Sequence, residues 1–285
     1  MLSESDVLRD RRRRPAASLK QQYQDYVMQR IENYKNSMSR DELLRLGDEA
    51  VSLITEADEG QFLLTEIMML ESVDRLIMKR LSLRSYRRWR QQFIKLRAAQ
   101  REPTHWGLEP AHPLAALLPR LEPEDCTVAI GHGGEAASYL LAAHDAAVTF
   151  LGTDLASVDR VESRMAAESL ALRDAYVVQL GHWLPDFEAP AHVVVLDVAC
   201  LADLDPALQR GLQHELQART RPGGVHVLLH GGGLAPEALL SYYDGWERDK
   251  LAATRGRGGR SGRRPAGIVL SSPPAEQEQA DALAL

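Results

Sequence analysis

The sequence lacks the features that mark membrane, secreted and disordered proteins. No apolar run reaches the roughly 18 residues of a transmembrane helix, and no apolar segment follows the arginines at 11–14 as it would in a secretory signal. Cys126 and Cys200 are the only cysteines, so we expect a reducing, cytoplasmic location and no disulfide framework. With 45% hydrophobic and 26% charged residues, the composition is globular. At about 100–200 residues per domain, the length of 285 residues predicts two domains.

Acidic residues are missing from one long segment. The net charge of −6 is unevenly distributed along the chain. Residues 1–101 carry 20 basic and 15 acidic side chains, and residues 102–285 carry 14 basic and 25 acidic ones. Ten of the basic residues, and no acid, lie within 75–101. This basic face is typical of nucleic-acid binding, of a solvated helix, or of docking on the acidic second half or a protein partner. Without a known DNA-binding pattern, we favour docking over nucleic acid, and a homodimer stays open.

Proline is absent between Pro15 and Pro103, which suits uninterrupted helices. We expect a flexible Arg-rich arm at 1–17 and an all-α helical bundle domain at 18–101. Ser39 and Glu42 have the spacing of a capping box at a helix start. The helix after them should bury one side, made of Leu43, Leu44, Leu46, Val51, Leu53 and Ile54. A third helix is expected from about 61 to 81, and a fourth around Trp89.

The second half has no long helical stripe. It has short apolar runs that alternate with helical segments, after a Pro-rich stretch at 102–125 that we interpret as a linker. This alternation predicts an α/β fold, namely a Rossmann-like doubly wound, mostly parallel sheet at 126–273. A disordered tail should follow at 274–285. Strands are expected at 127–130, 147–151, 175–180, 192–196, 225–229 and 267–270. Such sheets bind ligands beyond the carboxyl ends of their strands.

A glycine turn follows the first of these strands. Gly131, Gly133 and Gly134 permit positive φ and close approach of a ligand, and the helix that opens there offers unpaired N–H groups. Asp154 follows the second strand, 23 residues past Gly131, where an acid holds a ribose. Ser157 is a candidate N-cap of the next helix. The combination points to an adenosine-type ligand.

These pieces resemble the class I S-adenosylmethionine-dependent methyltransferases, most closely the tellurite-resistance-type branch. The strand at 192–197, the helix and Arg-Pro-Gly-Gly segment at 216–225, and 242–246 with the strand at 267–270 also match. The resemblance covers a little over half of the chain and implies S-adenosylmethionine as cofactor and methyl transfer to a small-molecule acceptor. The cofactor-binding residues that it implies are Gly131, His132, Gly133, Gly134, Asp154 and His182.

Three positions depart from the family pattern. Ala129 stands where the family has an acid two residues before the first glycine, and Glu135 replaces the third glycine. His182 lies where an Asp near the adenine is common. The alternative is therefore a catalytically silent methyltransferase-like binding or scaffold protein, whose helical domain carries a partner interface.

His132, His182 and His230 all follow strand ends, which raises the question of a metal. The sheet order of the family separates the third and fifth strands by four positions, or about 19 Å at 4.8 Å per step, so we expect no metal site. His230 and Asp197 are weaker candidates for the substrate cleft, and Asp197 could equally cap the next helix. The Arg- and Gly-rich stretch at 255–264 is interpreted as a mobile loop.

Overall fold

The computed structural model describes residues 18–57, 66–231, 234–248 and 267–274. The chain forms two compact units, Met1–Leu96 and Arg97–Leu285. Our expectations for the arm at 1–17, the start of the third helix near Gln61, the loop at 255–264 and the tail at 275–285 lie outside the described residues.

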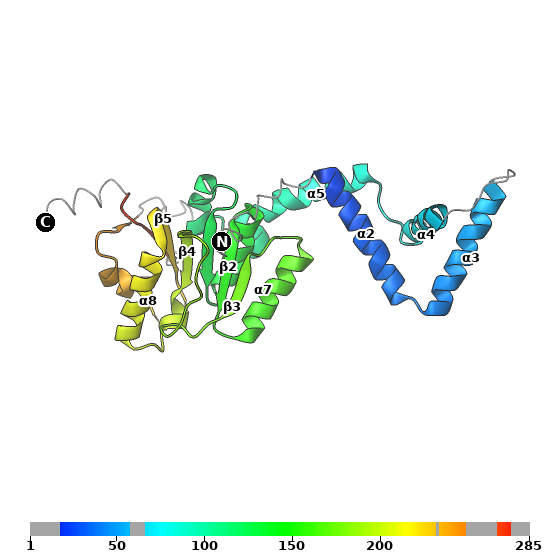
Figure 1. Ribbon diagram of the computed structural model, residues 1–285. Coiled ribbons are helices and arrows are strands. Elements are labelled where there is room, and N and C mark those ends of the chain that lie inside the picture. The colour runs from blue at the N-terminus through cyan, green and yellow to red at the C-terminus, as the bar shows by residue number, and fades with distance from the viewer. Residues whose placement is uncertain (1–17, 58–65, 232–233, 249–266, 275–285) are drawn as a thin grey trace, which may run out of the picture. The chain divides into compact units, whose positions relative to one another are not determined.

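The first unit is helical in its described part (Figure 1). It consists of α2 (Leu19–Ser37), α3 (Arg40–Ala57), α4 (Glu66–Arg80) and most of α5 (Tyr86–Gln100). The capping box is confirmed, since the Ser39 N–H donates to Glu42 Oε2 (2.8 Å) and the Glu42 N–H donates to Ser39 Oγ (3.4 Å). The predicted helices are therefore present, and the predicted capping box lies at the start of α3.

The helical unit has a buried apolar cluster. Among the residues whose burial the structure describes, its members are Val27, Ile31, Leu46, Ala50, Leu76 and Ile77. The prediction for the buried side of α3 was partly wrong, because Leu43, Leu44 and Leu53 are exposed while Leu46 is buried. The apolar stripe on α3 is wider than the surface its neighbours cover, so a stripe alone did not fix which residues are buried.

The second unit contains one seven-stranded sheet in the order β3-β2-β1-β4-β5-β7-β6. Strands β1 to β5 are parallel, and β7 is antiparallel to both β5 and β6. The predicted Rossmann-like, mostly parallel sheet is confirmed, and β3 and β5 are four positions apart as expected. The strand bounds are β1 Cys126–Ile130, β2 Ala147–Gly152, β3 Asp174–Val177, β4 Ala191–Asp197, β5 Thr220–Leu229, β6 Glu247–Arg248 and β7 Gly267–Ser271.

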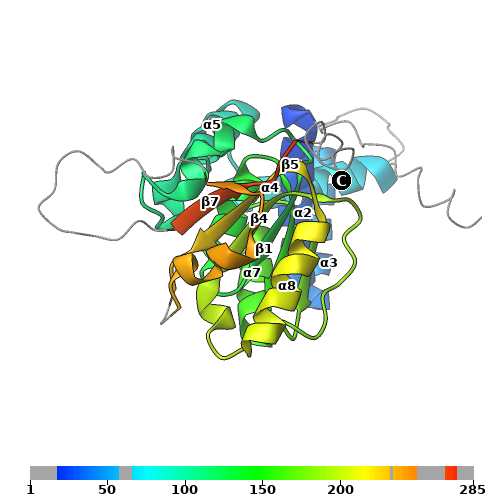
Figure 2. The ribbon, with the colours of Figure 1, turned by 90° about the vertical axis from the view of Figure 1, so that its left-hand side faces the viewer.

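Helices cover both faces of this sheet, as the doubly wound prediction requires. Helices α6 (Gly134–Ala143) and α7 (Leu155–Ala167) pack on one face, and α8 (Pro206–Ala218) packs on the other (Figure 1). Figure 2 looks onto the face that α8 covers. Each face of the sheet has its own hydrophobic core, and alternate residues of β4 pack into the two cores. Val193 and Val195 lie in one core, and Val194 and Leu196 lie in the other.

The Pro-rich segment at 102–125 belongs to the second unit and is not a free linker. It folds into the short 3-10 helices η1 (Pro103–Trp106), η2 (Pro113–Ala116) and η3 (Leu118–Arg120). Trp106, Leu114 and Leu117 are buried in the core beside α6, and Trp106 Nε1 donates to the Gln100 carbonyl at 2.6 Å. Burial of these apolar side chains moves the division of the chain to Leu96.

The Arg-Pro-Gly-Gly element is part of a strand that begins earlier than the predicted 225–229. It lies inside β5 as a bulge, since Ala191 pairs with Thr220 whereas Val193 pairs with Val225. Gly223 adopts φ 73°, the left-handed region that favours glycine. A Cβ on Gly224 would lie 2.5 Å from the Thr220 side chain, so both glycines are required by the backbone.

A buried polar chain ties β5 to the 3-10 helix η5 (Pro236–Tyr242). His226 is fully buried, with Nδ1 2.8 Å from the Tyr243 hydroxyl and Nε2 2.8 Å from Thr220 Oγ1. Burial lowers the pKa of His226 to about 3, so this histidine is neutral at pH 7.

Candidate functional site

The predicted site residues end or follow strands at the carboxyl edge of the sheet. Gly131 comes directly after β1 and Asp154 two residues after β2. Asp197 is the last residue of β4, His182 follows β3, and His230 follows β5. Because β1 to β5 are parallel, these positions share one edge, as the sequence predicted.

The glycine turn is tightly hydrogen-bonded. Gly131 has φ 81°, which only glycine adopts without strain, and its N–H donates to the Leu151 carbonyl at 2.9 Å. The Gly134 N–H donates back to the Gly131 carbonyl at 3.0 Å, and α6 begins at Gly134. The turn therefore delivers the start of a helix to the end of β1.

Asp197 lies against this turn. Its Oδ2 accepts from the Gly133 N–H at 2.7 Å, and its Oδ1 accepts from the Ala199 N–H at 3.0 Å. Since Ile130 pairs with Leu196, Gly131 and Asp197 occupy the next positions of neighbouring strands. Asp197 caps the 3-10 helix η4 (Val198–Leu201), which was one of its two predicted roles.

Three glycines make room for the Asp197 carboxylate. A Cβ on Gly133 would lie 2.9 Å from Oδ2, one on Gly231 would lie 2.3 Å from Oδ1, and one on Gly131 would lie 3.0 Å from the Asp197 Cβ. We call Gly131, Gly133 and Gly231 with the carboxylate that they surround the Asp197 socket. Asp197 is only 6% exposed there, so the socket holds a buried carboxylate bonded to backbone N–H groups.

Cys200 is a neighbour of the socket that the sequence reasoning missed. Its Sγ donates to the Asp197 carbonyl at 2.7 Å, and a Cβ on Gly131 would lie 3.2 Å from this sulfur. Burial, and secondarily the Asp197 charge, raises the pKa of the Cys200 thiol to about 12. The thiol is therefore protonated at pH 7 and is not a nucleophile.

Glu135 is paired within the chain. Its Oε1 accepts from Arg160 Nη2 on α7 at 2.8 Å and lies 2.7 Å from His132 Nδ1. The Glu135 side chain is 14% exposed and that of His132 is 78% exposed. The three residues join the start of α6 to α7. No sequence signal indicated Arg160, because it contacts Glu135 across two different helices.

Asp154 is the N-cap of α7, and the prediction that Ser157 is the cap was wrong. Asp154 Oδ1 accepts from the Ser157 N–H at 2.8 Å. Ser157 instead packs against β2, where a Cβ on Gly152 would lie 2.5 Å from its Oγ. The Asp154 side chain is exposed at the edge.

His182 and His230 lie apart from this cluster. His182 is exposed in a turn after β3, where its N–H donates to the Gln179 carbonyl at 3.1 Å. His230 Nε2 lies 3.9 Å from Glu237 Oε2. Within the described ranges, no three His, Cys, Asp or Glu side chains are grouped as metal ligands. The edge thus brings together Gly131, Gly133 and Asp197, and separately His132 and Glu135.

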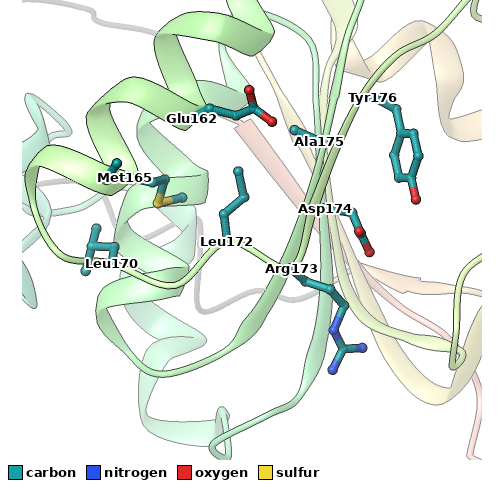
Figure 3. Close-up of a pocket in the computed structure, with 9 residues that line it drawn as sticks. Glu162, Met165, Leu170, Leu172, Arg173, Asp174, Ala175 and Tyr176 are labelled. Atoms are coloured by element: carbon teal, nitrogen blue, oxygen red, sulfur yellow. The ribbon is translucent and has the colours of Figure 1, made fainter.

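A pocket lies elsewhere, between α7 and the edge strand β3, with a volume of about 440 Å³. Figure 3 shows Met165 on the helix, Leu170, Leu172 and Arg173 on the loop that follows it, and Asp174 at the start of the strand. The lining residues come from the second half of α7, this loop and β3, towards the amino edge of the sheet. None of the predicted site residues lines it, so it is not part of the candidate site.

Comparison with known proteins gives structural neighbours only. No family model matches the chain, and no curated protein matches it. The TehB-like SAM-dependent methyltransferase from Corynebacterium glutamicum is 14% identical over 65% of this chain and 95% of its own, with a TM-score of 0.42. N-methyltransferase NodS from Bradyrhizobium japonicum is 12% identical over 66% and 96%, with a TM-score of 0.39.

A third neighbour was solved with ligands. The T. thermophilus 16S rRNA N2 G1207 methyltransferase RsmC, in complex with AdoMet and guanosine, is 24% identical over 59% of this chain and 43% of its own, with a TM-score of 0.40. The neighbours are SAM-dependent methyltransferases that include TehB-like ones. None of the described helices is long and apolar enough to cross a membrane.

Proposed function

We propose that residues 126–273 bind S-adenosylmethionine at the carboxyl edge of the sheet and transfer its methyl group to a small-molecule acceptor. The observation that carries this proposal is the pair of carboxylates, Asp154 and Asp197, that follow the two strands on either side of β1 and its glycine turn. The strand order matches the one that the family resemblance implies.

The donors and acceptors at this edge fit the cofactor chemically. S-adenosylmethionine carries an ammonium group and two ribose hydroxyls, all of which donate to carboxylates. The family acid is missing at Ala129, which is fully buried in β1. Asp197 supplies a carboxylate to the same turn from the neighbouring strand, bonded to the Gly133 N–H. Asp197 would hold the ammonium group and Asp154 the ribose.

The remaining residues at the edge would position the cofactor. Gly131 and Gly133 leave room for Asp197, whose carboxylate would contact the cofactor. The bound cofactor would supply an electrophilic methyl group, and its in-line displacement requires proximity more than a catalytic side chain. We therefore assign no catalytic residue.

The charge at the edge supports a small acceptor over a polyanion. Asp154 is exposed and acidic, Asp197 is buried, and Arg160 is held by Glu135. A nucleic acid would gain little from such an edge, because phosphate neutralisation by Lys and Arg dominates its affinity.

A second candidate is favoured by one specific observation. The Gly133 N–H, which a cofactor would otherwise meet, is already satisfied by Asp197, and Glu135 is paired with Arg160. Both contacts are internal to the chain. In this candidate the domain is a catalytically silent binding or scaffold module, and the helical unit carries the partner interface.

Titration calorimetry of the full chain with S-adenosylmethionine separates the two. We expect micromolar binding, weakened about 10- to 100-fold in Asp154→Asn and in Asp197→Asn, because each removes a charged hydrogen-bond partner worth about 1.5–3 kcal/mol. Asp174→Asn, at the start of β3 on the opposite edge, is the matched control and should bind like the native chain. Absence of binding at millimolar cofactor would contradict the enzyme and support the silent module.

A further inference from the structure

Helix α3 exposes more apolar surface than the helical unit uses. Leu43 and Leu44 are 42% and 60% exposed, although Leu46 and Ala50 of the same helix are fully buried. A Cβ on Gly47 would meet nothing within 4 Å, so the helix surface is open beside both leucines. A contiguous apolar strip of this kind marks a contact surface more often than scattered leucines do.

Acids follow the same strip. Asp41, Leu44, Asp48 and Val51 are spaced three, four and three residues apart, which places them on one face of α3. Asp41 and Asp48 are exposed, and neither takes part in an ion pair among the described residues. This acidic stripe, defined by the four residues, alternates charge with apolar side chains.

Helix α5 carries a stripe of opposite charge. Arg87, Arg90 and Ile94 are three and four residues apart and are all exposed. No ion pair within the described part of the chain uses Arg87 or Arg90. The aromatic side chains of α5 lie on another side of the helix. There the ring centroid of Trp89 is 5.4 Å from that of Tyr23 and 4.8 Å from that of Phe93. Arg87, Arg90 and Ile94 form the basic stripe.

We propose that residues 18–96 form a homodimerisation module in which the acidic stripe of α3 in each copy docks on the basic stripe of α5 in the other. A two-fold axis makes the two contacts identical, as in most homodimers. With the two helices antiparallel, Asp48 then lies opposite Arg87 and Arg90, and Leu44 lies opposite Ile94.

A second copy explains both stripes, whereas other partners explain one. Nucleic acid would meet the arginines of α5 but would be repelled by Asp41 and Asp48. The acidic second half of the chain could attract α5 and would likewise leave the acidic stripe exposed. A unit of about 80 residues is also of the size that often needs oligomerisation to be stable.

The test measures the mass of the full chain by sedimentation and light scattering over a range of concentrations. We expect a particle of twice the 31.7 kDa chain mass, with a dimer dissociation constant that rises with salt. The double variant Asp41→Lys, Asp48→Lys should raise that constant at least about tenfold, and so should Arg87→Asp, Arg90→Asp. Combining all four substitutions should restore dimerisation to within about threefold of native.

Two further variants keep the test decisive. Asp25→Lys, an exposed acid on α2 outside both stripes, is the matched control and should dimerise normally. Gly47→Leu fits the single chain, because nothing lies within 4 Å of its Cβ, and should weaken the dimer while circular dichroism stays native. A monomer at about 100 µM overturns the proposal, as does a dimer that ignores both charge reversals. Nucleic-acid binding by a monomer that Arg87→Asp, Arg90→Asp abolishes would assign α5 to nucleic acid instead.

Discussion

The two units of this chain bury apolar side chains to different degrees. Eight of the eleven exposed large hydrophobic side chains in the described residues lie in the helical unit, and three lie in the α/β unit. Among the residues whose burial the structure describes, the helical unit has six buried apolar residues in its cluster, whereas the two faces of the sheet have 22 and 18. Apolar stripes indicate the right helices in both units, but in the described residues the sheet covers more of the apolar side chains.

The largest expected effect tests whether the sheet core dominates stability. Phe150→Ala, in β2 at 0% exposure, should cost about 3–5 kcal/mol of unfolding free energy, because it removes a buried ring and leaves a cavity. Leu44→Ala in α3 should change the unfolding free energy by less than about 0.5 kcal/mol in the monomer. Urea unfolding followed by tryptophan fluorescence measures both.

Each tryptophan, as a fluorescence reporter of unfolding, can be assigned to one of the two units. Trp89 lies in the helical unit, and Trp106, Trp183 and Trp246 lie in the α/β unit, so a Trp89→Phe background reports on the second unit alone. A Phe150→Ala midpoint that does not move in this background would contradict the comparison.

The next effect concerns pH and acts on one unit only. All nine histidines lie beyond residue 101, and burial lowers the pKa of His226 to about 3 and that of His112 to about 4. When folding lowers a histidine pKa from about 6.5, the neutral histidine favours the folded state, and this stabilisation is fully present above pH 6.5. It is lost as the pH falls from 6.5 towards the folded-state pKa, by about 1.4 kcal/mol of unfolding free energy per pH unit. Between pH 6.5 and 5, His226 should cost about 2 kcal/mol of stability.

The slope of stability against pH is the measurement for this prediction. His226→Phe should flatten it in the α/β transition, whereas His214→Gln, an exposed histidine on α8, should keep it. Equal slopes in all three proteins would rule out His226 as the cause.

The smallest effect returns to the helical unit. Ser39→Ala removes the acceptor for the Glu42 N–H at the start of α3 and should cost about 1 kcal/mol. The loss should appear in circular dichroism and Trp89 fluorescence, and not in the tryptophans of the α/β unit. Thr104→Ala, outside the helical unit, serves as the control. An equal shift in both units would mean that they unfold together, and the comparison would then describe one cooperative body.

The sequence predicted the parallel strands well because both faces of the sheet are covered. β1, β2 and β4 are mostly apolar and almost entirely buried, which leaves little choice of structure. The buried side of α3 was predicted poorly, since Leu43 and Leu46 are equally apolar and only the neighbouring helices distinguish them. The bulge at Gly223 was missed because its pairing partner lies on another strand.

The candidate site divides in the same way. Gly131 and Asp197 could be placed together from sequence, because both follow parallel strands and chain topology alone brings them to one edge. Arg160 and Cys200 could not, since their contacts depend on how side chains pack between α6, α7 and η4. Asp154 was placed correctly at the end of β2, but the competition with Ser157 for the cap was decided by the packing of Gly152.

The Asp197 socket has a consequence for thiol chemistry. Burial raises the pKa of both Cys200, at the socket, and Cys126, at the start of β1. Both sulfurs are therefore almost entirely protonated at neutral pH, and alkylating reagents react with thiolates. The rate of alkylation at Cys200 would report on local opening of the carboxyl edge. The rate at Cys126 would report on separation of the strands, so the native chain contains two probes of opening that need no added label.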